Sequence, residues 1–140
     1  MSAANRTVPD SQFEPAALLQ RITLFDGVLC AAFGLLLVAA AGPLADLFDL
    51  PALLLRLVGV GLLPWAAFVL YIATRTPISR SLTWVVVAGN GVWTIASLLL
   101  LVSSQVDPSA LGYAFVIAQA VLVAIIAETQ IIGLRRVSTR

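Results

Sequence analysis

The chain has 140 residues, of which 61% are hydrophobic, and its net charge at pH 7 is +1. A mean hydropathy of +1.04 excludes an ordinary soluble domain, and the small charge excludes the basic surface that nucleic-acid binding needs. The chain has no histidine and one cysteine, Cys30, so it offers no usual acid/base imidazole, no Cys cluster for a metal and no internal disulfide. We therefore expect no metal and no cofactor.

The first predicted element is a flexible N-terminal leader, residues 1–15. Four apolar runs follow it, and each is long enough as a helix, at ~1.5 Å rise per residue, to cross a hydrocarbon core of roughly 30 Å. These runs are the predicted membrane spans: 22–41, 52–73, 82–102 and 111–134. They take up most of the chain, which leaves room for a single domain, 1–140, and for no separate soluble one.

Short connections join the four spans, so consecutive spans should be antiparallel neighbours in an all-α, up-down-up-down bundle. Most arginines flank the two termini and the middle connection, namely Arg6, Arg21, Arg75, Arg80, Arg135, Arg136 and Arg140. By the positive-inside rule we expect both termini to be cytoplasmic. The absence of lysine beside eight arginines favours a GC-rich bacterial genome, and hence the bacterial inner membrane.

Two acidic residues lie inside the predicted spans, Asp26 in the first and Glu128 in the fourth. Intramembrane carboxyl groups are costly, so each needs a reason, and both are expected in the cytoplasmic third of the bundle. One hypothesis is a proton- or cation-binding pair facing an inner cavity, in which Glu128 is the better candidate. The alternative is structural pairing with the arginines at the inner boundary.

Three further polar residues complete the candidate sites. Arg56, near the outer end of the second span, is either an interface anchor that snorkels toward Asp46, Asp49 or Asp107 in the two connections expected to face outward, or a functional residue. Asn90 and Gln119 both lie near the expected midplane of their spans. We expect them to bond across a helix pair, and the alternative is a polar pocket for a substrate.

No combination of nucleophile, base and orienting group can be assembled, so the sequence predicts a protein that is not an enzyme. Three roles stay open. The first is a bundle that binds or stabilises another membrane component. The second is a small oligomeric transporter or channel that uses Glu128 or Asp26. The third is a lipid or quinone binder with an apolar cleft beside Pro64. The expected partners are the lipid bilayer and either further copies of the chain or another membrane protein.

The four-span layout resembles uncharacterised small bacterial integral membrane proteins, a likeness that covers most of the chain and implies no activity. The residues that carry it are Gly61, Pro64, Asn90, Trp93, Gly112 to Phe115, Gln119, Glu128, Gln130 and Gly133 to Arg136. The chain lacks the basic-flanked glycine run and phenylalanine box associated with fluoride channels. It also lacks the early span-one glutamate that marks small multidrug exporters.

Overall fold

The computed structural model describes residues 13–138, which form five α-helices and no strand. The helices are α1 (Phe13–Ala39), α2 (Ala41–Phe48), α3 (Ala52–Ala73), α4 (Arg80–Val102) and α5 (Ala110–Ser138). Four of them, α1, α3, α4 and α5, are long and apolar enough to cross a membrane. The all-helical prediction with four membrane-spanning helices is thus confirmed.

The helix boundaries follow the predicted spans closely, with two differences. First, α1 already begins at Phe13, so residues 13–15 of the expected leader are helical, and residues 1–12 lie outside the described residues. Second, α2 occupies a segment expected to be a connection. Pro43 is compatible with this helix because proline is tolerated in a first helical turn. Asp49 ends α2 in a left-handed conformation at φ 51°.

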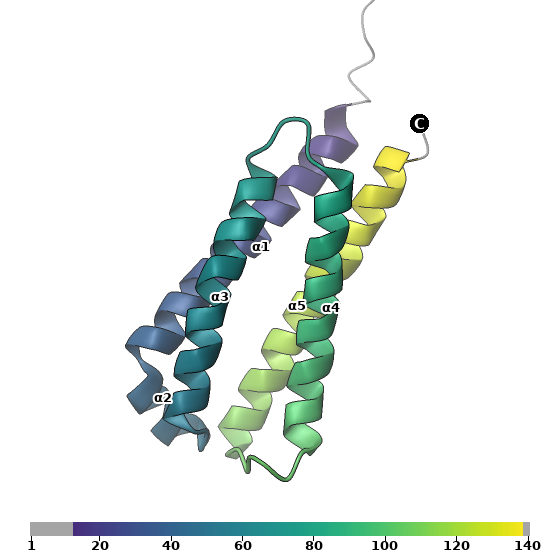
Figure 1. The fold of residues 1–140 in the computed structure, drawn as a ribbon. Coiled ribbons are helices and arrows are strands. Elements are labelled where there is room, and N and C mark those ends of the chain that lie inside the picture. The colour runs from purple at the N-terminus through teal and green to yellow at the C-terminus, as the bar shows by residue number, and fades with distance from the viewer. Residues whose placement is uncertain (1–12, 139–140) are drawn as a thin grey trace, which may run out of the picture.

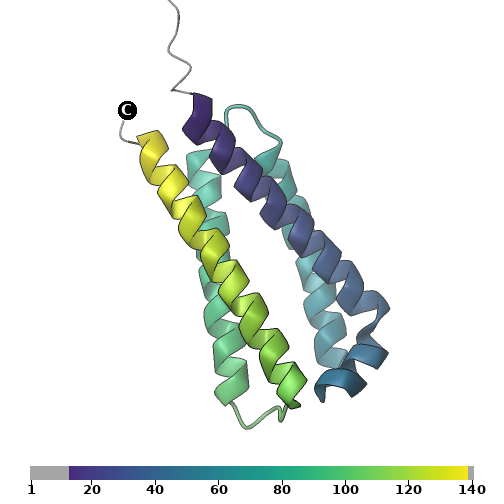
Figure 2. The same ribbon diagram turned by 180° about the vertical axis from the view of Figure 1, so that it is seen from behind.

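The long helices alternate in direction along the chain (Figure 1). α1 begins and α5 ends at one end of the bundle, which we call the terminal end; α2 lies at the other, the α2 end (Figures 1 and 2). The connection between α3 and α4 is also at the terminal end. The described arginines other than Arg56 therefore gather there, while Asp46, Asp49 and Asp107 lie at the α2 end.

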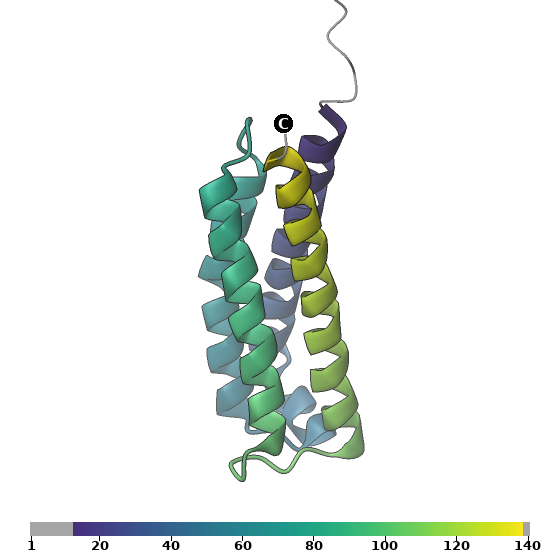
Figure 3. The same ribbon diagram turned by 90° about the vertical axis from the view of Figure 1, so that its right-hand side faces the viewer.

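The four long helices pack unevenly around the bundle. α1 packs along α3, and α4 packs along α5, while α1 and α5 join the two pairs (Figure 3). Contact between α3 and α4 is confined to a few positions. The bundle is consequently closed on the α1–α5 side and little packed on the α3–α4 side.

Glycines set the close contact between α1 and α3. A Cβ atom on Gly59 would lie 2.8 Å from the carbonyl oxygen of Gly34, and one on Gly34 would lie 3.1 Å from that of Gly59. A Cβ on Gly27 would lie 2.8 Å from the side chain of Leu70. These three glycines thus allow the backbones of α1 and α3 to approach closely.

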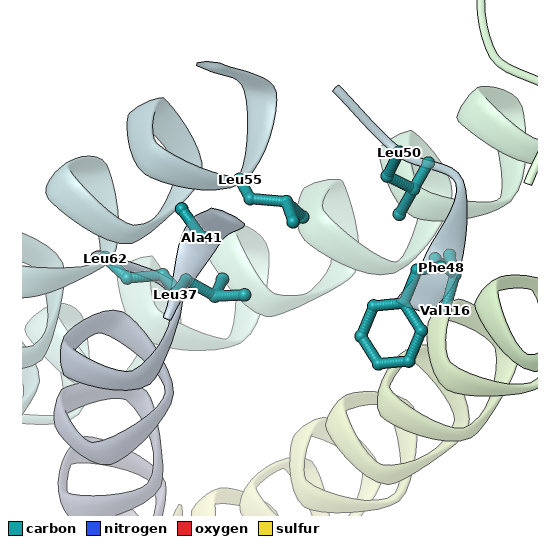
Figure 4. Close-up of a cluster of buried hydrophobic side chains, with 7 residues drawn as sticks. All are labelled: Leu37, Ala41, Phe48, Leu50, Leu55, Leu62 and Val116. Carbon is teal, nitrogen blue, oxygen red and sulfur yellow. The ribbon is translucent and has the colours of Figure 1, made fainter. Parts of the chain in front are cut away.

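A buried apolar cluster holds the α2 end together. It combines residues of α1, α2, α3, α5 and the α2–α3 connection: Leu37, Ala41, Phe48, Leu50, Leu55, Leu62 and Val116 (Figure 4). Ser109 fastens α2 to the start of α5, since its N–H donates to the Phe48 carbonyl (2.9 Å) and its hydroxyl to the Leu47 carbonyl (3.0 Å). The Ser109 Oγ also accepts from the Gly112 N–H at 3.1 Å, which caps α5. The short helix therefore packs against α1, α3 and α5 at the α2 end of the bundle.

Large apolar side chains cover much of the outer surface of the four long helices, among them Leu35, Leu53, Val60, Ile95 and Leu99. A soluble monomer rarely exposes contiguous apolar surface of this extent. Lipid chains would cover such a surface without penalty, so the outer surface agrees with the four candidate spans as a multi-pass membrane protein.

Candidate functional site: a cleft between α3 and α4

A cavity lies between α3 and α4, which pack little against each other, and we call it the cleft. Its volume is about 430 Å³, within the roughly 300–1,000 Å³ typical of small-molecule sites. Its walls are mostly apolar and come from all four long helices, including Leu29, Phe33, Leu57, Val58, Trp65, Val92, Trp93 and Leu122. A second cavity of about 260 Å³ continues toward the α2 end and shares Phe33, Val58 and Trp93 with the cleft.

The cleft opens through the outer surface of the bundle. Two of its lining residues, Leu57 on α3 and Val92 on α4, are 62% and 67% exposed, so they mark a mouth on the outer surface of the bundle. Gly61 also lines the cleft, and a Cβ there would meet nothing within 4 Å. Toward the terminal end the cleft is closed by Trp65, whose ring lies where a Cβ of Gly89 would be, at 2.3 Å. Gly89 thus provides the room for the indole between the two helices.

The polar floor of the cleft centres on Asp26, a residue of α1 that is 1% exposed. Its Oδ2 accepts hydrogen bonds from Asn90 Nδ2 on α4 (2.8 Å) and from Gln130 Nε2 on α5 (3.1 Å). Asn90 Nδ2 also donates to Gln130 Oε1 at 3.3 Å. We call these three residues the carboxyl cluster. Because each donor is an amide, the cluster satisfies a carboxylate oxygen without a cation.

Two oxygens of the carboxyl cluster keep accepting capacity. Asp26 Oδ1 receives only the weak thiol donor of Cys30, with Sγ at 3.8 Å. Asn90 Oδ1 receives no hydrogen bond from the described residues, although no buried side-chain oxygen or nitrogen among them lacks a partner. Asn90 Oδ1 must therefore border open space, and Asn90 lines the cleft. The floor offers hydrogen-bond acceptors to a molecule inside.

A second polar cluster lies nearer the α2 end. Trp93 Nε1 donates to Gln119 Oε1 at 2.7 Å, and Gln119 Nε2 donates to Ser97 Oγ at 2.9 Å and to the Val116 carbonyl at 3.1 Å. The Ser97 hydroxyl in turn donates to the Trp93 carbonyl. These bonds hold α4 and α5 together and fix the edge of the Trp93 ring at the cleft wall.

The expected bond between Asn90 and Gln119 is not formed. Asn90 bonds to Asp26 and Gln130, and Gln119 bonds to Trp93 and Ser97, so each amide finds partners at its own level along the bundle. The expectation rested on their similar depth in separate helices. Depth alone does not bring two side chains together, because the rotation and tilt of each helix decide which side chains meet.

The two intramembrane acids do not share a cavity. Asp26 lies in the carboxyl cluster, whereas Glu128 is exposed on α5 and is not among the cleft-lining residues. The alternative expectation for Asp26, pairing with boundary arginines, is also not what forms, since its carboxyl group bonds to Asn90, Gln130 and Cys30. Arg56 is exposed near the start of α3, at the α2 end and away from the cleft lining.

Three residues of the site were not among the sequence candidates: Gln130, Cys30 and Trp65. Gln130 shares a helix face with Gln119, eleven residues earlier, and this spacing was the available signal. Cys30 lies one turn after Asp26, so the two share a face of α1. No sequence signal separates Trp65 from an ordinary interfacial tryptophan, because its place depends on Gly89 of another helix.

The charges of the cleft limit what it can hold. Among the described residues that line the cleft, Asp26 alone has a carboxyl group, and none is an arginine or a lysine. A phosphate headgroup would find no cationic partner and one like charge. Groups of metal-ligating side chains were not found among the described residues. The cleft therefore suits an apolar molecule that carries a hydrogen-bond donor or a positive charge.

Comparison of the chain with protein-family models, with curated proteins and with solved structures found no match. The class that the fold defines is a multi-pass helical membrane protein, with a cleft that opens on the outer surface of the bundle.

Proposed function

We propose that the protein is a non-enzymatic binding protein whose cleft holds an apolar, hydroxyl-bearing molecule drawn from the bilayer, with the chemistry of a quinol. Of the three roles that the sequence leaves open, this proposal combines the first, the binding of a membrane component, with the third, a lipid or quinone binder. The observation that carries it is one cavity in which a lipid-facing mouth at Leu57 and Val92 leads to the acceptor oxygens of Asp26 and Asn90.

The chemistry of the cleft supports this ligand class in two ways. The aromatic rings of Trp65, Trp93 and Phe33 provide flat apolar surface for a ring and an isoprenoid chain. Two accepting oxygens in a dry site favour a donor such as a hydroxyl group, and a ligand that lacks the donor leaves them unpaired. A ligand that resides among the lipid chains can reach the mouth sideways between α3 and α4.

We further propose the bacterial inner membrane as the location, with both termini in the cytoplasm. The gathering of Arg21, Arg75, Arg80, Arg135 and Arg136 at the terminal end supports this orientation.

The experiment is a titration of the protein in lipid nanodiscs with a short-chain quinol kept reduced, followed by tryptophan fluorescence. We expect saturable quenching, because Trp65 and Trp93 line the cleft. The matching oxidised quinone, which has carbonyl acceptors and no hydroxyl donor, should bind at least about tenfold more weakly, the effect of roughly one unsatisfied buried polar group. Equal binding of the two forms, or none, would contradict the proposal.

Two glycines give a matched pair of variants. Gly61→Leu fills the cleft, and Gly91→Leu adds the same side chain at a position outside its lining; a Cβ meets nothing within 4 Å at either. Quinol binding should be lost in Gly61→Leu and kept in Gly91→Leu. Loss in both or in neither would mean that the quenching arises elsewhere.

The second candidate, transport of a hydrophobic cation, is favoured by the carboxyl group of Asp26 in the cleft. The two functions separate by ligand, and Asp26→Asn, which replaces one carboxylate oxygen with an amide nitrogen and removes the charge, tests Asp26 under each. Under the proposed function the variant weakens quinol binding, because its single amide oxygen pairs with Asn90 and Gln130 and an N–H group faces the cleft. A lipophilic cation such as tetraphenylphosphonium should bind only under the transport role, and Asp26→Asn should then abolish that binding.

A further inference from the structure

One face of α5 remains uncovered along the whole length of the helix. The residues on it are all exposed, and they are spaced alternately three and four apart: Leu111, Ala114, Ala118, Val121, Ile125, Glu128, Ile132 and Arg135. This is the a/d spacing of a heptad repeat, which brings two parallel helices together along a continuous seam. We call this set the α5 seam.

Glu128 is the residue of the α5 seam whose exposure to lipid chains is energetically costly, because its side chain is a carboxyl group. It lies seven residues, or about 10 Å, before Arg135 along the helix. It is also two residues from Gln130, which reaches the buried Asp26. Within the described part of the chain Glu128 has no hydrogen bond or ion pair. A carboxyl group at this depth needs a polar neighbour, which lipid chains cannot supply.

We propose that the α5 seam binds the same seam of a second copy of this chain, so that the two Glu128 side chains meet inside the membrane. Copies inserted by the same rule have the same orientation, so their α5 helices are parallel, as heptad pairing requires. In such a two-fold pair each residue faces its own counterpart. A carboxyl group with a proton both donates and accepts, so one shared or two exchanged protons satisfy the pair.

The remaining residues of the α5 seam suit this pairing. Ala114 and Ala118 let the two helices come close near the α2 end, and Val121 and Ile125 provide apolar side chains between the alanines and Glu128. The α5 seam and the mouth of the cleft lie on different sides of the bundle, since α3 and α4 are in front in Figure 1 and α1 and α5 in Figure 2. A dimer through α5 therefore leaves the cleft open to lipid.

Cysteine cross-linking in native membranes tests the interface directly. In a Cys30→Ala background, single cysteines at Val121 and Ile125 probe the α5 seam, while Phe25→Cys on α1 and Val85→Cys on α4 probe other exposed faces. We expect oxidation to give covalent dimers at both seam positions and at neither control position. Dimers at Val85 but not at the seam, a cross-link to a different protein, or monomers throughout would overturn the proposal.

The role of Glu128 is tested by energy transfer between labelled copies in liposomes. Glu128→Gln keeps a side chain that donates and accepts, so dimerisation should persist. Glu128→Leu removes the polar pair and should weaken the dimer about five- to thirtyfold, the effect of an interhelical hydrogen bond of about 1–2 kcal/mol. Val121→Leu is the control for an apolar change on the same face. Dimerisation unaffected by Glu128→Leu would exclude the pairing of the two carboxyl groups.

Discussion

Asn90 Nδ2 donates a 2.8 Å hydrogen bond to Asp26 Oδ2, and this bond joins two helices, α4 and α1, that are not neighbours around the bundle. The helices follow one another around the bundle in the order α1, α3, α4, α5, so the bond crosses its diagonal. It places a buried carboxyl group beside the cleft and fixes how far apart the two helix pairs stand. The carboxyl cluster is therefore both a structural tie and the floor of the candidate site.

The first prediction concerns this tie. Asn90→Leu leaves the carboxyl group of Asp26 with one amide donor, so we expect the free energy of unfolding to fall by about 1–3 kcal/mol. Thermal unfolding in detergent, followed by circular dichroism, measures the change. The control is Thr94→Val, which removes only a hydroxyl that bonds to a carbonyl of its own helix.

A double variant sharpens the same test. Asp26→Leu together with Asn90→Leu removes the buried carboxyl group and its donor at once, so it should destabilise the protein by less than the sum of the single changes. Additive losses would mean that the two residues stabilise the bundle independently and that the bond between them contributes little to the free energy of unfolding.

The second prediction concerns the α1–α3 contact. Gly59→Ala places a Cβ 2.8 Å from the backbone oxygen of Gly34, so the helices must separate, and we expect a loss of about 1–3 kcal/mol in unfolding free energy. Gly61→Ala, two residues later on α3, meets nothing within 4 Å and should leave the stability equal or slightly higher. The two melting temperatures give the answer, and similar values would show that α1 and α3 do not pack through their glycines.

The third prediction concerns the second polar cluster. Gln119→Leu leaves Trp93 Nε1 without its acceptor, which should lower the unfolding free energy by about 1–3 kcal/mol. Trp93→Phe in addition removes the unpaired N–H and should restore part of the loss. Chemical unfolding in bicelles measures all three proteins. If the double variant is less stable than Gln119→Leu, the indole does not depend on Gln119.

The fourth prediction concerns orientation. In a Cys30→Ala background, Thr76→Cys marks the α3–α4 connection and Ser104→Cys the α4–α5 connection, and both positions are exposed. With the arginine-rich terminal end in the cytoplasm, a membrane-impermeant maleimide should label Ser104→Cys in intact cells with a permeabilised outer membrane and label Thr76→Cys only in inside-out vesicles. The reverse pattern would place the termini outside.

Much of the fold could be predicted because membrane insertion is read from short stretches of sequence. The length and hydropathy of each run depend on its own residues alone, and α3 accordingly has the bounds expected for the second span. The helix α2 was missed because Gly42 and Pro43 are typical of a loop. Its stability comes from packing Phe48 and Leu50 against other helices, which local sequence does not report.

The candidate site shows where sequence reasoning reaches its limit. Asp26 and Asn90 were both singled out as intramembrane polar residues, but nothing in either helix says that they bond to each other. Asp26 and Glu128 both have carboxyl groups, and each lies within a predicted span. Only the packing of α1 and α5 buries Asp26 and leaves Glu128 exposed.

By itself, then, the sequence determined four membrane-spanning helices, the clustering of arginines near the termini and the middle connection, and the positions of the rare polar residues, because these follow from composition along the chain. The tertiary structure decided which polar groups meet, that Glu128 faces outward and that a cleft remains between α3 and α4. The physical reason is that these features depend on the rotation, tilt and spacing of helices relative to one another. Contacts such as Gly34 with Gly59 and Trp65 with Gly89 set that geometry, and they join residues far apart in the chain.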